Sequence, residues 1–201
     1  RFKAPQAVEV TVPADAIVAD ANKQSIISLA WLMVNQIKDP VSLENFALNV
    51  AGDLLTSGPQ SYFYEALLEP GLGSGFAPGT GYGGSRRETS FAVGLKDVAE
   101  ADLKKVETTI LEVLERISRE GFPRDRVEAV MHQVELDAAV VTTQFGLYAG
   151  FGAFSTWVHD GDSLRSLRTP ELAAKLNAAL DADPQFWQKL IKKWFLDNTH
   201  R

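Results

Sequence analysis

Cysteine is absent from the 201-residue sequence, and histidine occurs only three times. Without cysteine the chain has no disulfide bond, no thiolate metal site and no cysteine nucleophile. This composition fits a reducing compartment. The scarcity of histidine also leaves few ways to assemble a zinc site, which draws most often on histidine and cysteine ligands.

Long apolar runs and an excess of basic residues are missing too. No apolar run reaches the roughly 18 residues that a membrane span requires, so we expect no membrane partner. Asp and Glu number 26 against 20 Lys and Arg, a formal charge of −6, which argues against nucleic acid as a partner. The sequence itself contains no signal-peptide pattern; it begins at Arg1 and stops at Arg201. We expect a fragment of a longer, multidomain polypeptide.

The sequence does contain enough apolar residues for one sizeable core. It is 45% hydrophobic and 23% charged, which is ordinary for a soluble globular protein. Nine of the fifteen glycines lie between Gly58 and Lys96. In this stretch Ser61 is predicted to cap a helical turn over Tyr62–Leu68 that Pro70–Gly71 ends. A strand follows the glycines.

The strand after the glycines alternates between two faces. One face is predicted to carry Arg87, Thr89, Phe91, Val93 and Leu95, and the other Arg86, Glu88, Ser90, Ala92 and Gly94. Upstream, Val8, Val10 and Val12 alternate with polar residues and predict a half-exposed strand that stops at Pro13. Residues 24–34 predict another strand. Apolar residues on both of its faces suggest a central position, covered at least in part on each side.

Helical spacing accounts for most of the remaining chain. Asp39–Pro40 predicts the start of a helix whose apolar face runs from Leu43 to Leu55. A second helix is predicted over 100–120, ended by Gly121, and a third from about 124 to 143 or beyond. The conformation of the apolar segment 145–157 is left open. Thr169–Pro170 and Asp183–Pro184 predict two more capped helix starts.

The last predicted helix carries apolar residues around much of its circumference. They are Phe186, Trp187, Leu190, Ile191, Trp194 and Phe195. We expect the rest of the chain to leave Phe186 and Phe195 uncovered, so that they contact a neighbouring domain or a second copy of this chain.

Together these elements predict the α+β fold class, with a mostly antiparallel sheet and helices packed on one face. We expect one domain over 1–201. Its sheet and long helices span 1–157, and a helical tail spans 158–201.

Each candidate chemical motif also has an ordinary structural explanation. His132-Gln133-Val134-Glu135 begins like a zinc-hydrolase motif, but Leu136 stands where the second histidine is required. His159 beside Asp160 and Asp162 could bind a metal, although a polar turn is the commoner structure. The glycines at 71, 73 and 75 follow a helix and precede a strand, the reverse of a phosphate-binding loop. Arg86 and Arg87 could bind a peptide carboxylate, or could be solvated or paired with an acid.

Five segments, in order, resemble the presequence protease branch of the pitrilysin-type zinc metallopeptidases. They are 59–73 (Pro-Gln-Ser-x-Phe-Tyr-x-Ala-Leu-Leu-Glu-x-Gly-Leu-Gly), 91–95 (Phe-x-Val-Gly-Leu), 120–129 (Glu-Gly-Phe and Arg-Val-Glu-Ala), 157–162 (Trp-x-His-Asp-Gly-Asp) and 197–201 (Asp-Asn-x-His-Arg). The resemblance implies one of four related α+β domains that enclose a peptide-digesting chamber. This chain resembles the second of these domains, which lacks the metal.

The resemblance carries no catalytic, cofactor-binding or metal-binding residue onto this chain. The family's zinc motif belongs to the first domain, and the comparable helix here, over 39–55, has no histidine. The implied function is that of a non-catalytic structural domain of a zinc metalloendopeptidase that degrades unfolded peptides such as targeting presequences. Zinc would belong to the parent enzyme. The implied partners are the other domains and peptide substrates, and the implied compartment is a mitochondrial or plastid matrix or another soluble one. The alternative is a peptidase-like structural subunit without proteolytic activity.

Overall fold

A single antiparallel sheet organises the protein. The computed structural model describes residues 2–14, 20–35, 43–164 and 168–201. Strand β4 (Glu88–Val98) lies in the middle and pairs with β1 (Ser25–Asn35) on one side. On its other side it pairs with two short strands, β2 (Gly75–Phe76) and β3 (Gly81–Gly83), which follow one another along the same edge.

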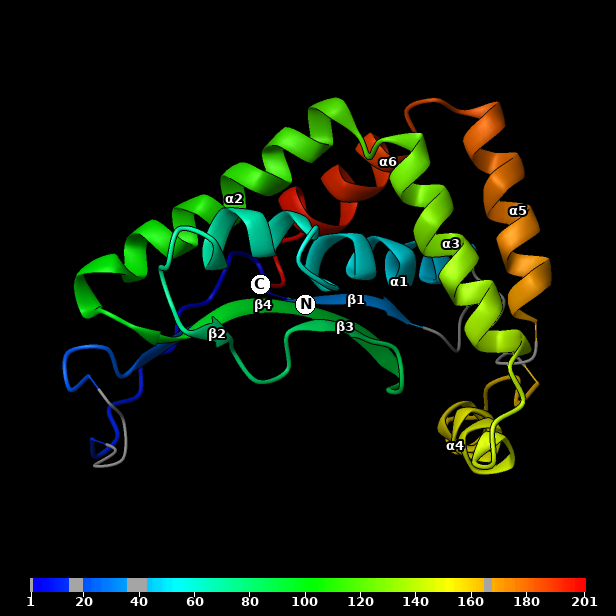
Figure 1. Ribbon diagram of the computed structural model, residues 1–201, viewed down its shortest axis with the longest axis horizontal. Helices are drawn as coiled ribbons and strands as arrows, with labels where there is room; N and C mark the ends of the chain where they lie inside the picture. The colour runs from blue at the N-terminus through cyan, green and yellow to red at the C-terminus, as the bar shows by residue number, and fades with distance from the viewer. Residues whose placement is uncertain (1, 15–19, 36–42, 165–167) are drawn as a thin grey trace.

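Helices cover one face of this sheet. Figure 1 shows α1 (Leu43–Thr56), α2 (Leu103–Glu120) and α6 (Phe186–Ile191) above it, with α3 (Arg124–Ala139) and α5 (Thr169–Ala182) at one end. Helix α4 (Phe145–Trp157) projects beyond the opposite face. Shorter helical pieces complete the chain: π-helical turns at Tyr64–Leu68 and Lys192–Leu196, and a 3₁₀ turn at Glu100–Asp102. The predicted α+β class, with an antiparallel sheet and helices on one face, is confirmed.

The core lies between the sheet and the helices above it. The face of β4 formed by Thr89, Phe91, Val93 and Leu95 is fully buried, as its alternation predicts. The Phe91 ring lies 5.1 Å from that of Phe195 and 6.1 Å from that of Trp31, measured between centroids. Aromatic rings from the middle strand, the edge strand and the last helical turn therefore meet at the centre. Arg87, predicted on the same face, is exposed because β4 begins one residue later.

The long helices follow their predicted apolar stripes. In α1 and α2 the residues at helical spacing are buried, and Gly121 ends α2 with a φ of 77°, in the left-handed region that favours glycine. Helix α3 ends at Ala139, sooner than predicted. The predicted start at Asp39–Pro40 lies outside the described residues.

The three side-chain caps predicted on described residues are wrong. The Ser61 hydroxyl donates to the Gly58 carbonyl (2.8 Å) rather than accepting a helix N–H, and Thr169 forms no cap because Arg168 holds the cap position of α5. The third is wrong as well: the Asp183 carboxylate accepts the backbone N–H of Gln185 at 3.0 Å, but Gln185 holds the cap position of α6 and its side chain makes no cap hydrogen bond.

The strand predicted at Val8–Val12 is wrong. The described residues 2–14 contain no strand, and Val8 is 87% exposed. Alternation gives a segment a strand-like pattern, but a strand also needs a neighbour to complete its hydrogen bonds. Among the described residues, that neighbour is missing.

The expectation that 24–34 forms a central strand, covered at least in part on both faces, is also wrong. Strand β1 lies beside β4 only, and its second face is open: Ile26 is 61% exposed, and Ser28 and Ala30 are exposed as well. No helix packs on that side of the sheet among the described residues (Figure 1). Only the other face is covered, since Leu29, Trp31 and Met33 are buried.

Uncovered apolar side chains were predicted on the last helix, at Phe186 and Phe195, but they occur on a different helix. Phe195 is buried to 1% exposure against the central aromatic rings, and Phe186 is only partly exposed. The last helix therefore packs within its own fold instead of presenting a docking face. Exposed apolar residues gather instead along α4, where Trp157 is 64% exposed.

Candidate functional site

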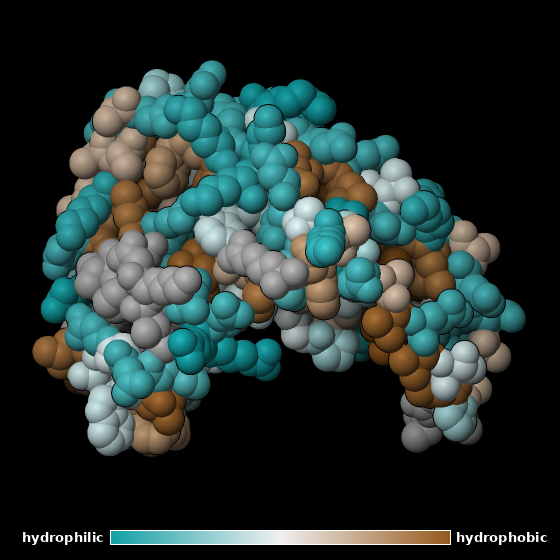
Figure 2. All heavy atoms as spheres, turned by 180° about the vertical axis from the view of Figure 1, so that it is seen from behind, coloured by the Kyte–Doolittle hydropathy of each residue, from teal (hydrophilic) through white to brown (hydrophobic). Residues whose placement is uncertain are grey.

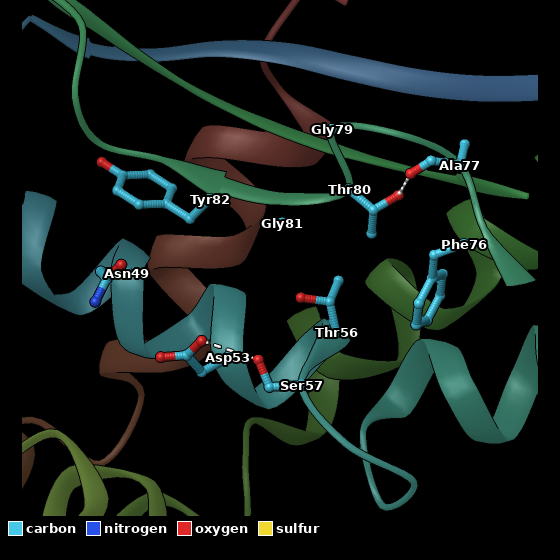
Figure 3. A pocket seen from close by; sticks show the side chains of 10 residues that line it. All are labelled: Asn49, Asp53, Thr56, Ser57, Phe76, Ala77, Gly79, Thr80, Gly81 and Tyr82. Carbon is cyan, nitrogen blue, oxygen red and sulfur yellow. Dashed lines mark hydrogen bonds between the residues drawn. The ribbon is translucent and has the colours of Figure 1, made fainter. Parts of the chain in front are cut away.

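A polar cleft separates α1 from the strand edge formed by β2 and β3. It has a volume of about 420 Å³. Helix α1 supplies one wall with Asn49, Asp53 and Thr56, and Ser57 follows the helix end. The other wall is the segment from Phe76 to Tyr82 (Figure 3).

Close packing brings the two walls together at Gly52. A side chain on this residue would place its Cβ 2.8 Å from the Tyr82 Cβ, so only glycine lets β3 approach α1 this closely. The Tyr82 hydroxyl reaches across to the buried Asn45 amide oxygen, one helical turn before Asn49. Tyr82 thus spans the cleft end and fixes the distance between strand edge and helix.

The Asp53 carboxylate is the chemically distinctive group of the cleft. One of its oxygens, Oδ1, accepts a hydrogen bond from the Ser57 hydroxyl at 3.0 Å (Figure 3). Burial raises the pKa of Asp53 above its ordinary value, the Ser57 hydrogen bond partly opposes this, and Asp137 on α3 adds to the rise in pKa. The site therefore holds a carboxylate whose charge is costly until a cation approaches it.

A second, wider cleft brings together several residues singled out by the sequence. Its volume is about 600 Å³, and Asn35, Arg86, Arg87, Glu88 and His159 line it. It lies where β1 ends and β4 begins. The two arginines and the histidine that the sequence pointed to separately therefore share one surface, beside an acid.

The histidines occupy three separate places. His132 is exposed on α3. His159 lies in the wider cleft, and its neighbour Asp162 is already engaged with Arg168 (3.2 Å) and the backbone N–H of Leu164. His200 accepts the backbone N–H of Phe2 and stacks on its ring at a centroid distance of 3.9 Å.

The residues present do not fit a zinc ion. Over the described ranges no three His, Cys, Asp or Glu side chains lie close enough together to hold a metal. Catalytic zinc sites use three protein ligands, usually including histidine, and α1 carries no histidine.

No helix in the described part of the chain has the length and apolarity to cross a membrane.

The alternation and helix patterns indicated neither wall of the polar cleft as a site. A signal exists in the sequence nevertheless. Asn49, Asp53 and Ser57 recur every four residues beside an otherwise apolar helix face, which places them in one row. What the sequence could not indicate is that the glycine-rich segment crosses this row.

Comparisons with known proteins identify the family of this chain. Residues 2–134 match the family model described as the Peptidase M16 inactive domain. The mouse protein named "Presequence protease, mitochondrial" is 34% identical over 197 residues, 98% of this chain and 19% of that protein. The protein of the same name from Yarrowia lipolytica is 35% identical over 188 residues, 94% of this chain and 19% of that protein.

Solved structures share the fold at low identity. An inactive peptidase domain from Bordetella parapertussis superposes with a TM-score of 0.65 at 16% identity, covering 84% of this chain and 85% of that chain. A protease from Helicobacter pylori gives 0.61 at 12% identity, over 90% of this chain and 40% of that chain. The chain spans about a fifth of the length of the curated relatives that it matches. It belongs to the inactive-domain family of the M16 peptidases, and is a non-catalytic domain of the metallopeptidase type.

Proposed function

We propose that this chain forms part of the wall of a peptide-digesting chamber in a zinc metalloendopeptidase that degrades unfolded peptides such as targeting presequences. One observation carries the proposal: the chain matches presequence proteases from end to end while spanning only 19% of their length. In that setting the chain is one domain of a multidomain polypeptide. The zinc is bound by another domain of the same polypeptide.

The shape of the domain supports a role as part of the chamber wall. Figure 2 shows an arch, hollowed on the side opposite the covering helices. The sheet face without helices carries small side chains such as Ser28, Ala30 and Ala92. A broad surface of this kind leaves room for an extended peptide.

The edge of the sheet supports direct contact with peptide. Strands β2 and β3 pair with β4 on one side, and no strand among the described residues pairs with their other side. An extended peptide adds to such an edge through main-chain hydrogen bonds. The polar cleft runs along this edge, between the strands and α1.

Helix α4 supports docking onto the remaining polypeptide. Its sequence is apolar around most of its circumference, which is typical of a helix buried inside a larger protein. Phe151, Phe154 and Trp157 are all more than half exposed. Within the chamber enzyme these side chains are covered by a neighbouring domain. The names of the relatives place those proteins in mitochondria, which supports a mitochondrial location for the parent of this chain.

The test is to express the parent polypeptide and measure degradation of an unfolded peptide by it and by this 201-residue chain alone. We expect the parent to contain an intact His-x-x-Glu-His motif and to degrade the peptide only with zinc, and the chain alone to be inactive. A parent without that motif or that activity would contradict the proposal, and would favour a structural subunit without proteolytic activity.

A further inference from the structure

The polar cleft has a charge pattern suited to a cation. Ten of the described residues line it, and among these Asp53 is the only one that is charged at neutral pH; none of the ten is Lys or Arg. Ser57 occupies Oδ1 of the carboxylate, while Oδ2 has no hydrogen-bond partner among the described residues. A half-buried carboxylate with an oxygen available and no cation nearby attracts a positively charged ligand.

Aromatic rings stand at both ends of the same cleft. Figure 3 shows Phe76 at one end and Tyr82 at the other, with Asp53 on the helix wall across from Tyr82. Both rings are partly exposed. A planar guanidinium group stacks on aromatic faces and also forms two parallel hydrogen bonds to a carboxylate. The combination therefore suits an arginine side chain better than a lysine.

The position of the carboxylate relative to the strand edge determines what reaches it. Side chains of a β-strand point alternately to the two faces of a sheet. In a peptide that lies along β2 and β3, every second side chain would point toward the face that α1 covers. Asn49, Asp53 and Ser57 line the cleft on that face, so such a side chain would meet this row.

We propose that this cleft is a specificity subsite for a cationic side chain, arginine foremost, of a peptide bound along the β2–β3 edge, with the Asp53 carboxylate as its counter-ion. The inference rests on the proposed function, and it names one feature of the peptides. Mitochondrial targeting peptides are rich in arginine and poor in acidic residues, so most of them offer a suitable side chain. The bound cation compensates the charge that burial makes costly at Asp53.

The test compares two peptides and two protein variants. One peptide contains a single central arginine; in the other, citrulline replaces it, which keeps the shape and removes the charge. Each is titrated into the 201-residue chain, into Asp53→Asn and into Asp125→Asn, with backbone amide NMR as the readout. Asp125 is exposed on α3 and does not line the cleft. Asp125→Asn therefore makes the same change in net charge as Asp53→Asn, but away from the cleft. N-acetylarginine amide is a third probe that needs no strand edge.

We expect the arginine peptide to bind the unchanged chain about fivefold more tightly than the citrulline peptide, as expected for a partly exposed ion pair. Asp53→Asn should remove this preference, and Asp125→Asn should keep it. Equal binding of the citrulline peptide to both variants shows that Asp53→Asn is folded.

Three outcomes would overturn the subsite. The first is equal binding of both peptides to the unchanged chain, which leaves the edge, and with it the proposed function, intact. The second is a preference that survives Asp53→Asn. The third is the absence of binding by all three probes, which contradicts the peptide-contact part of the proposed function as well. Binding of N-acetylarginine amide at Asp53 without binding of either peptide supports the subsite and contradicts contact at the edge.

Discussion

Replacing Phe91 with alanine tests the arrangement of sheet and helices on which the account depends. The Phe91 side chain is fully buried on the middle strand. Its ring contacts those of Trp31, Phe63 and Phe195, at centroid distances of 6.1, 6.5 and 5.1 Å. These three partners come from the edge strand, from the helical turn after α1 and from the end of the chain. The substitution therefore opens a cavity where three separate segments meet.

The expected loss of unfolding free energy is about 3–5 kcal/mol, the cost of truncating a buried phenylalanine. In a domain of this size 1 kcal/mol moves the melting temperature by about 2–4 °C, so Tm should fall by about 6–20 °C. Glu88→Ala is the matched control, because Glu88 is exposed at the start of the same strand. Its effect should stay within about 0.5 kcal/mol.

The assay is thermal and urea unfolding of the unchanged chain and both variants, followed by circular dichroism. A Tm loss at least several times larger for Phe91→Ala than for Glu88→Ala agrees with the burial pattern of β4. Comparable losses for the two variants would show that the strand faces are assigned wrongly, and the position of the polar cleft beside β3 would then be wrong as well.

Three further predictions concern the cleft, the open sheet face and α4. Because the folded pKa of Asp53 is raised, its charge costs stability at neutral pH, and this cost disappears as pH falls through the folded pKa toward the unfolded value near 3.8. Asp53→Asn should therefore raise Tm at pH 7 and change it little at pH 4; an equal change at both pH values would refute the burial argument. Gly94→Ala should lower stability on the order of 3 kcal/mol, because its Cβ would lie 1.9 Å from a backbone carbonyl oxygen of β1. Gly146→Ala, with open space around it, should be neutral or stabilising by up to about 1 kcal/mol, and similar losses for both would contradict the packing at Gly94. The chain alone should self-associate through α4, so Phe151→Ser should shift its sedimentation toward the monomer while Leu136→Ser on α3 does not; an unchanged profile for Phe151→Ser would exclude α4 as the contact.

The sequence predicted the elements whose burial pattern is set by near neighbours in the chain. Phe91, Val93 and Leu95 alternate on β4 as expected, and the apolar stripe of α2 is buried as its spacing requires. Period-2 and period-3.6 patterns record which side of an element is covered, and here one layer of helices covers one face of the sheet. These patterns were sufficient for the fold class.

Features that depend on distant segments were not predicted. The alternation at Val8–Val12 is the same as in a paired strand, and only the absence of a neighbouring strand in the described residues distinguishes it. Phe195 was expected at a docking face because its partner rings lie more than a hundred residues away in the sequence. The Asp53 cleft forms only because the glycine-rich segment crosses α1 at Gly52. In each case the deciding contact joins segments that are far apart in the sequence, and such a contact leaves no periodic pattern in either segment.

Zinc binding by the isolated chain tests the central claim, that this is a non-catalytic domain, most directly. The chain is treated with chelator, reloaded with zinc, passed through a desalting column and measured for bound metal and for hydrolysis of an unfolded peptide. The account predicts no stoichiometric zinc after desalting and no hydrolysis above the rate without protein. One tightly bound zinc per chain, together with hydrolysis that His132→Ala abolishes, would contradict it.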